Sequence, residues 1–395
     1  QDAVTSELFD IALTGSTVQE AGNPEFGDMT ARNISIAAST VHLNADTHVS
    51  ASNTFSSTGD SFNMSDHLTA LGGVSIDCTG VVSGVGIFNS GANDISMHGS
   101  LIDILGKIAA ANNVTFIATG NVILESGASI SAAGLLTSSG INFTFDSGGA
   151  AENITADGIE LNHSGAVLID NGMDSTTGNF IINGSSITTS VFNSPPFSTT
   201  GTLAGTNITL TAATGDVSIG AAVNATGTFS STGVNFTNTA AITAVGVTID
   251  HAATVNLNGA INGQSGNVSI TGTNVASNAS GTVAGHNLTL SGVADTTLAG
   301  AITASGTFNS AGTNFTNTGA IAASAIAILF HFIFRKADVQ KGRETGRENA
   351  GAIAFHRSVF AGSCVSITAA RGGTRRAHTH THTHTHTRTR ARAPA

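Results

Sequence analysis

Histidine has the widest chemical range of the side chains in this chain. Seven histidines are scattered singly through the first 330 residues: His42, His48, His67, His98, His163, His251 and His286. A zinc site needs three or four converging imidazole, carboxylate or thiolate ligands, and no carboxylates or thiolates are spaced to complete one here. His163 and His251 occupy matching places in NHSGAVLID and DHAATVNLN, which indicates surface residues inherited by duplication. The sequence predicts no metal-binding and no cofactor-binding residue.

Five more histidines alternate with threonine near the C-terminus: His378, His380, His382, His384 and His386. His-rich tracts can bind divalent metals, but a spacing of two residues defines no zinc geometry. Alternating Thr-His is also what a run of ACACAC encodes. We therefore interpret residues 378–387 as a translated dinucleotide repeat.

Acidic residues are the side chains that could catalyse polysaccharide cleavage. Glycosidic hydrolysis uses two carboxylates about 5–9 Å apart, and on a repetitive scaffold such a pair would be close in sequence or one repeat apart. Asp216, Asp250 and Asp295 are isolated, and the chain has no Trp or Tyr to stack on a sugar. The sequence favours a protein that is not an enzyme and predicts no catalytic residue; a β-helical carbohydrate-active enzyme, a lyase or hydrolase, remains the alternative.

The elements that would position these residues follow a fixed period. Residues 207–306 divide into five consecutive units of 21, 19, 20, 20 and 20 residues, most of which open with an alternating strand pattern. A period near 20 is typical of a solenoid in which each unit is one rung. Stacking such rungs strand on strand predicts an all-β fold, a parallel β-helix, and the crossover rule makes it right-handed.

A longer period lies over the short one. Four-rung blocks open at Asn33, Asn113, Asn207 and Asn287, with spacings of 80, 94 and 80 residues. The surplus residues of the second block fall in 113–134, 135–158 and 179–206, the last of which carries VFNSPPFSTT. Insertions that leave the flanking rungs intact are predicted to form loops at a corner.

Three segments follow from this pattern. Residues 1–32 are predicted to be a divergent rung or an N-terminal cap, residues 33–326 the β-helix, and residues 327–395 an irregular or disordered tail. The apolar run 319–334 is short for a membrane span, which needs about 20 residues. A weak helical period is present at 101–111.

Charge separates the body from the tail. Up to Phe330 there are two basic and 22 acidic residues, and from His331 onward there are 12 basic and three acidic residues. The acidic body lacks the basic patch that nucleic-acid binding requires, so nucleic acid is not expected as a partner.

Within the rungs, several residue types have expected structural roles. The large side chains Phe229, Phe236, Phe308 and Phe315 are predicted to fill the interior. Glycine at rung ends is expected to supply the positive φ of tight corners. Asn-x-Ser/Thr recurs at rung starts, where we interpret Asn as a corner residue and not as a glycosylation site; the positions are Asn33, Asn113, Asn142, Asn207, Asn235, Asn267, Asn287 and Asn314.

Residues 204–227 (AGTNITLTAATGDVSIGAAVNATG) and 284–306 (AGHNLTLSGVADTTLAGAITASG) resemble repeats of filamentous-haemagglutinin-like exoproteins, adhesins of bacterial two-partner secretion. The resemblance covers residues 33–326. It implies a right-handed parallel β-helix, a secreted or cell-surface location, and attachment to host or environmental glycans or proteins. It also implies an outer-membrane export partner, and it transfers no functional residue.

Overall fold

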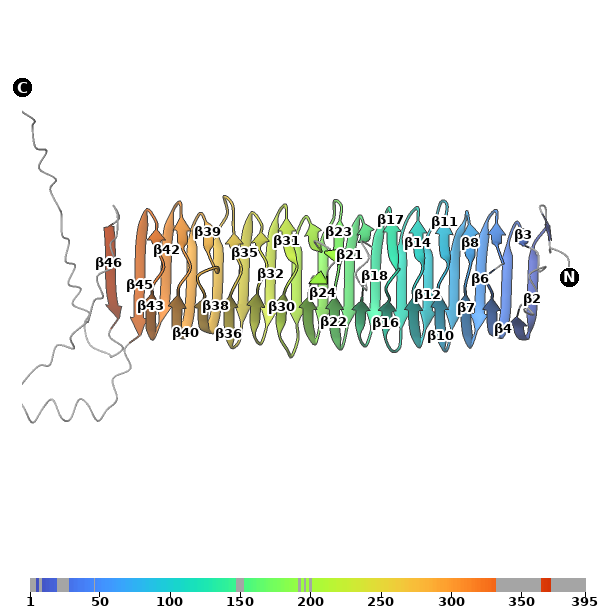
Figure 1. The fold of residues 1–395 in the computed structure, drawn as a ribbon, viewed down its shortest axis with the longest axis horizontal. Coiled ribbons are helices and arrows are strands. Elements are labelled where there is room, and N and C mark those ends of the chain that lie inside the picture. The colour runs from blue at the N-terminus through green and yellow to red at the C-terminus, as the bar shows by residue number, and fades with distance from the viewer. Residues whose placement is uncertain are drawn as a thin grey trace, which may run out of the picture.

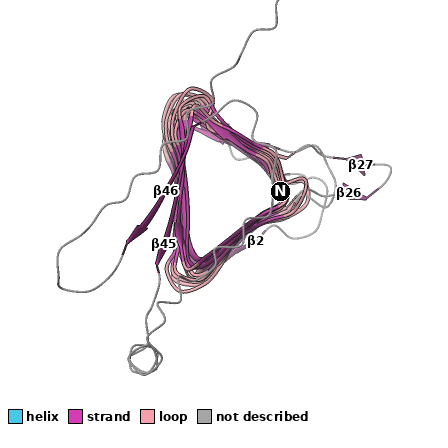
Figure 2. Cartoon of the chain, turned by 90° about the vertical axis from the view of Figure 1, so that its left-hand side faces the viewer, coloured by secondary structure: helices cyan, strands magenta, loops and turns pink. Residues whose placement is uncertain are grey.

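The computed structural model shows a parallel β-helix that contains nearly all of the described residues. It appears as a rod from the side (Figure 1) and has a triangular cross-section when seen along its axis (Figure 2). The described residues form strands and turns but no helix, and so none that could span a membrane. The structure describes residues 5–6, 9–19, 28–45, 47–146, 153–190, 193–194, 197–198, 201–331 and 364–370.

Each turn of the coil contributes one strand to each of three faces. The first face is a sheet of 16 parallel strands. Its strands are β1 (Thr5–Ser6), β3 (Met29–Ala31), β5 (Val49–Ala51), β8 (His67–Ala70), β11 (Ile87–Ser90), β14 (Lys107–Ala110), β17 (Ser129–Ala132), β20 (Asn153–Ala156), β23 (Gly172–Ser175), β28 (Thr202–Gly205), β31 (Ala222–Ala225), β34 (Ile242–Thr243), β37 (Ile261–Asn262), β39 (Val283–Gly285), β41 (Ile302–Ala304) and β44 (Ile321–Ala322).

The second face follows the first in each turn and has the longest strands. Its strands are β2 (Ile11–Gln19), β4 (Ile34–Leu43), β6 (Thr54–Gly59), β9 (Gly73–Cys78), β12 (Ile95–Gly99), β15 (Val114–Ala118), β18 (Leu135–Gly140), β21 (Gly158–His163), β24 (Phe180–Gly184), β29 (Ile208–Ala212), β32 (Thr228–Gly233), β35 (Gly246–His251), β38 (Val268–Ser277), β40 (Leu288–Leu298), β42 (Thr307–Gly312), β45 (Ala325–His331) and β46 (Cys364–Ala370).

The third face joins the second without a break where β4, β38 and β40 continue round the corner and pair on both faces. Its separate strands are β7 (Ser61–Met64), β10 (Val81–Gly84), β13 (Leu101–Ile104), β16 (Val122–Leu124), β19 (Phe143–Phe145), β22 (Ala166–Ile169), β25 (Ser186–Thr189), β30 (Val217–Ile219), β33 (Phe236–Asn238), β36 (Thr254–Leu257) and β43 (Asn314–Asn317).

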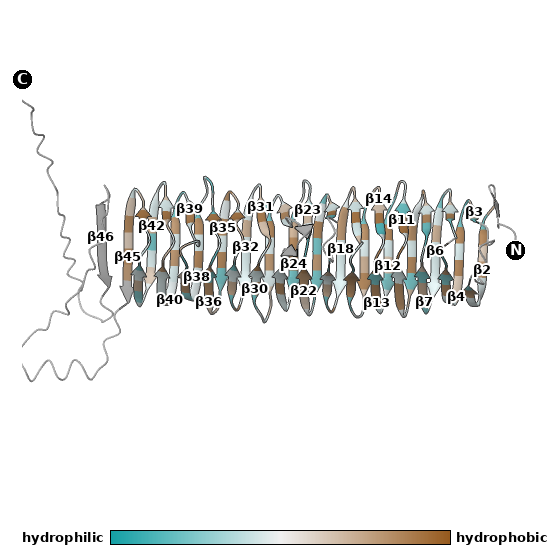
Figure 3. Cartoon of the chain, in the orientation of Figure 1, coloured by the Kyte–Doolittle hydropathy of each residue, from teal (hydrophilic) through white to brown (hydrophobic). Residues whose placement is uncertain are grey.

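The core forms because the strand alternation is kept in register from rung to rung. On the third face, for example, Val82 pairs with Ile102, which pairs with Val122, which pairs with Phe143. All four side chains are buried, so like residues stack into continuous apolar columns. Figure 3 shows these hydrophobic positions recurring along successive strands. The predicted parallel β-helix with rungs of about 20 residues is confirmed.

The interior accommodates the phenylalanines as predicted, with one difference. Phe229, Phe236 and Phe308 are fully buried, whereas Phe315 is partly buried against the core. The helical period at 101–111 proves to be two strands, β13 and β14, in which alternate residues are buried.

The sequence allowed a rung at the N-terminal end of the coil but placed the C-terminal end too early. At the N-terminus β2 pairs with β4 over eight residue pairs, and Arg32 donates two hydrogen bonds to Asp10 at 3.0 and 3.1 Å, so residues 11–31 contain a rung of the coil. At the C-terminus the boundary at 326 is wrong. Strand β45 continues to His331 and pairs with β42 and β46, because Ile326 and Ile328 continue the inward alternation.

One insertion lies outside the triangular coil. Strands β26 (Asn193–Ser194) and β27 (Phe197–Ser198) pair antiparallel and stand away from one corner (Figure 2). The flanking strands β25 and β28 keep their places in their sheets. This confirms the prediction that the surplus of 179–206 lies in a loop at a corner. Much of the surplus predicted for 135–158 lies outside the described residues.

The corners are built by asparagine, as expected from the rung starts. Nδ2 of Asn207 donates a hydrogen bond to Oδ1 of Asn179 at 2.9 Å. Oδ1 of Asn207 accepts a hydrogen bond from the backbone amide of Thr228 at 3.0 Å. Asn287 repeats this with Asn267 and Thr307, at 3.0 Å in both bonds. Each side chain therefore ties its rung to the rungs before and after it.

Glycine has a different main role from the one expected. Only Gly59, Gly73, Gly127 and Gly312 have positive φ among the described glycines. At many other glycines the reason is close approach between rungs. A Cβ on Gly266 would lie 1.4 Å from the carbonyl oxygen of Val245, so no other residue fits without moving the backbone.

Candidate functional site

Three side chains that can bind a metal converge at one corner of the coil. They are His48, Asp66 and His67, and their potential ligand atoms all lie within 4.8 Å of one another. His48 directly precedes β5 and His67 begins β8. Because Val49 pairs with Leu68, the two histidines occupy equivalent positions in adjacent rungs. The expectation that no carboxylate converges on a body histidine is therefore wrong for this cluster.

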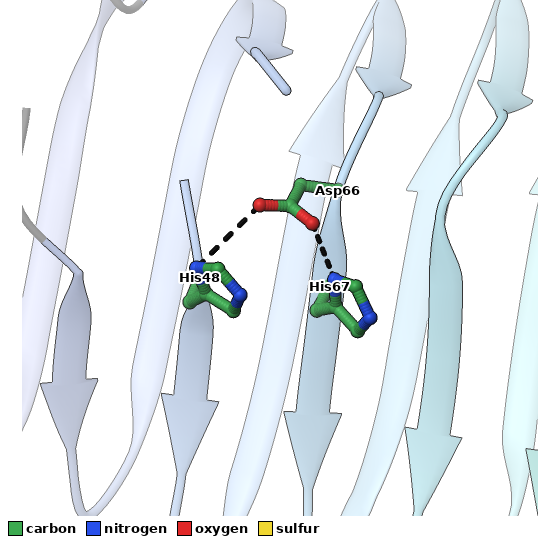
Figure 4. Close-up of side chains that lie close together, drawn as sticks. All are labelled: His48, Asp66 and His67. Atoms are coloured by element: carbon green, nitrogen blue, oxygen red, sulfur yellow. Dashed lines mark hydrogen bonds and ion pairs between the residues drawn. The ribbon is translucent and has the colours of Figure 1, made fainter. Parts of the chain in front are cut away.

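The geometry of the cluster is shown in Figure 4. The two imidazole rings stack with their centroids 5.2 Å apart and their planes inclined by 14°. Both rings turn Nδ1 toward Asp66. Nδ1 of His48 is 3.5 Å from Oδ2 of Asp66, and Nδ1 of His67 contacts Oδ1. Oδ1 of Asp28, from the preceding rung, lies 3.4 Å from Nδ1 of His48.

Burial distinguishes the carboxylate from the two histidines. The side chain of Asp66 is 10% exposed, whereas those of His48 and His67 are 58% and 49% exposed. In the next two rungs the place of Asp66 is taken by Gly86 and Gly106. Asp66 therefore puts a carboxylate at a corner position that these neighbours leave without a side chain.

A second His–Asp contact lies further along the rod. Nδ1 of His98 is 2.7 Å from Oδ1 of Asp77, one rung apart on the second face. Both side chains are largely exposed, at 45% and 64%. The pair offers two ligands and belongs to no larger cluster of His, Cys, Asp or Glu within the described part of the chain.

The prediction that His163 and His251 are surface residues is wrong. Both are buried, with 4% and 2% exposure. Nε2 of His163 lies 3.0 Å from the hydroxyl oxygen of Ser138, and Nε2 of His251 lies 3.0 Å from that of Ser231. Desolvation by burial lowers the pKa of each imidazole to about 4. Both histidines are therefore neutral at pH 7.

Space for these buried rings comes from the rung below. His163 pairs with Gly140 and His251 pairs with Gly233, so no side chain of the preceding rung competes for the interior. Phe143 and Phe236 pack against the two rings at centroid distances of 5.4 and 5.3 Å. The shared Ser, Gly and Phe partners show that the two blocks keep the same internal arrangement.

Asp216, Asp250 and Asp295 belong to no cluster of three or more His, Cys, Asp or Glu side chains among the described residues. Asp216 accepts hydrogen bonds from Asn235, and Asp295 accepts one from Asn314 at 2.6 Å. Asp250 faces outward from β35. A shallow depression of about 310 Å³ is lined in part by Asp157 and Glu160. Asp157 accepts a hydrogen bond from Thr177 and Glu160 one from Asn162, so both carboxylates have structural partners.

Two points about the histidines predicted from the sequence remain, the fate of the tail histidines and the sequence signal for the cluster at His48. The tail histidines 378–386 lie outside the described residues. The sequence signal for the cluster at His48 is the 19-residue separation from His67, which equals one rung, together with the adjacent Asp66.

Comparison with protein-family models, curated proteins and solved structures found no match to this chain.

Proposed function

We propose that this protein is a secreted or cell-surface structural repeat protein, part of an adhesin that attaches to host or environmental glycans or proteins. One observation supports this most. A parallel coil with 16 strands on its first face, with a filled interior, bears a hairpin that projects from one corner (Figure 2). At about 4.8 Å per rung the rod is roughly 75 Å long, and the hairpin, which lies near its middle, stands roughly 30–45 Å from either end.

The composition supports the same proposal. Outward strand positions carry mainly Thr, Ser and Asn, and the body is acidic, which does not suit a nucleic-acid partner. The resemblance of residues 204–227 and 284–306 to filamentous-haemagglutinin-like repeats adds an attachment role and an outer-membrane export partner.

The experiment compares the full chain with a variant that lacks residues 191–200. In the next rung β30 and β31 are joined by only Gly220 and Ala221, so the deletion leaves Ser190 and Gly201 as an equivalent two-residue connection. Both proteins are tested for binding to a glycan array and to cultured cells. Circular dichroism and thermal unfolding check that the rod is intact.

We expect the full chain to bind a defined set of surfaces and the deletion variant to lose most of that binding at unchanged thermal stability. Absence of binding by the full chain to every glycan and cell surface contradicts the proposal. Equal binding by both proteins contradicts the role assigned to the hairpin. The alternative, a carbohydrate-active enzyme, predicts instead that polysaccharide is cleaved and that Asp157→Asn or Glu160→Gln abolishes cleavage.

A further inference from the structure

The cluster of His48, Asp66 and His67 has the ligand types and the arrangement of a metal site. We propose that these residues bind one divalent transition-metal ion of the zinc class, with Asp28 as a fourth ligand. Two imidazoles with one or two carboxylates are ligands that zinc accepts in tetrahedral sites. His48, Asp66 and His67 come from two consecutive rungs and meet at one corner of the coil, and Asp28 of the rung before contacts His48.

The distances are close to those of a bound site. In a tetrahedral site with bonds of about 2.0–2.1 Å, neighbouring ligand atoms lie roughly 3.3 Å apart. Nδ1 of His48 is 3.5 Å from Asp66 and 3.4 Å from Asp28, and the three clustered ligand atoms lie within 4.8 Å. Nδ1 of His67 and Oδ1 of Asp66 are closer together than ligand atoms around an ion, so the exposed ring of His67 must rotate slightly away from Asp66 to admit the metal.

The backbone already holds these ligands near one another. His48 and His67 are fixed in register by the parallel pairing of β5 and β8, and their rings stack in parallel. Metal binding therefore needs no ordering of a loop. Both histidines remain about half exposed, which leaves an open path for the ion from solvent.

Charge gives an independent argument. Asp66 is a buried carboxylate, and in the described residues neither lysine nor arginine forms an ion pair with it. Burial of a carboxylate is unfavourable unless a cation or several hydrogen bonds compensate for lost hydration. Its partners are two imidazoles, and a neutral imidazole that keeps its proton on Nε2 presents the Nδ1 lone pair to a metal. A divalent ion between these groups supplies the missing positive charge.

The test uses the full chain in a background that removes competing ligands from the tail. This background carries His378→Gln, His380→Gln, His382→Gln, His384→Gln and His386→Gln. Zinc chloride is titrated into it by calorimetry. The site variants are His48→Ala and His67→Ala, and the matched control is His98→Ala, which removes the histidine of the exposed pair with Asp77.

We expect one zinc ion per chain in the background protein and a higher thermal midpoint in its presence. His48→Ala and His67→Ala should each weaken zinc binding more than tenfold, and His98→Ala should change it less than twofold. Absence of one-to-one saturable binding, or equal binding by all three variants, overturns the proposal.

A second measurement uses the unaltered protein, so its result does not depend on whether a variant folds. Diethylpyrocarbonate modifies exposed imidazoles, and peptide mapping by mass spectrometry gives a rate for each histidine. Zinc should slow modification of His48 and His67 at least several-fold and leave His98 and His286 unchanged. Equal rates at His48 and His67 with and without zinc overturn the proposal.

Discussion

His163 and His251 occupy equivalent buried positions in two blocks, and each imidazole lies 3.0 Å through Nε2 from a serine hydroxyl of the preceding rung. Their sequence separation of 88 residues spans four rungs and the hairpin insertion. The repeated contact shows that the two blocks share the same interior, including its polar groups. It also makes the stability of the rod depend on pH.

The stability of the rod should fall as pH falls from 6.5 to 4. Burial lowers the pKa of both histidines to about 4, so between these values the unfolded chain binds protons that the folded chain does not. Each histidine should therefore remove up to about 3 kcal/mol from the unfolding free energy by pH 4, with no further loss from this source below pH 4. Urea unfolding between pH 7 and 4 measures this loss.

The matched variants isolate the histidine contribution from that of the carboxylates. His163→Gln with His251→Gln should flatten the pH dependence, and His286→Gln, at an exposed position, should leave it unchanged. A pH profile of the double variant that superimposes on the wild-type profile would contradict this explanation.

Cys78 should be unreactive in the folded protein. Its side chain is buried, and desolvation, followed by the nearby charges of Asp77 and Asp60, raises the pKa of its thiol to about 11. The thiolate that reacts with alkylating reagents is therefore scarce at pH 8. In a Cys364→Ser chain, Ellman's reagent should label less than about a tenth of the protein until urea unfolds it. Rapid labelling of the folded chain would show that this part of the coil opens.

Asn207→Ala should destabilise the rod by about 1–2 kcal/mol, because it removes hydrogen bonds to two neighbouring rungs. The control is Asn256→Ala, on the outward side of β36, where the described residues provide no side-chain hydrogen bond. This control should change stability by less than about 0.5 kcal/mol. Thermal and urea unfolding measure both, and equal effects would refute a structural role for the corner asparagines.

Gly266→Ala should destabilise the rod by about 3 kcal/mol, because the added Cβ would collide with the carbonyl oxygen of Val245 in the rung below. Gly15→Ala provides the comparison, since a Cβ there meets its nearest neighbour at 3.9 Å. That variant should stay within about 0.5 kcal/mol of the wild type. Urea midpoints that agree for the two variants would mean that the rungs can separate at low cost.

Much of the architecture was predictable because the physical cause is local and repeated. Alternation such as Ile208 and Leu210 marks the inward side of a strand, and a period near 20 returns that side to the same face in every turn. The insertion at 191–200 was also visible, because the flanking rungs kept their spacing. The strand at 325–331 was missed because the composition changes there while the inward alternation of Ile326 and Ile328 continues.

The sequence by itself determined the coil, its period and the columns that fill it, because alternation and spacing act along the chain. The tertiary structure decided what happens at the corners. The inward orientation of His163 follows the alternation of Ile159 and Leu161 within β21, but the space it fills, above Gly140, exists only when the two rungs are in register. The meeting of His48 with Asp66 and His67 depends likewise on the register between β5 and β8. Side chains one rung apart in the sequence become neighbours only when successive turns of the coil stack on one another.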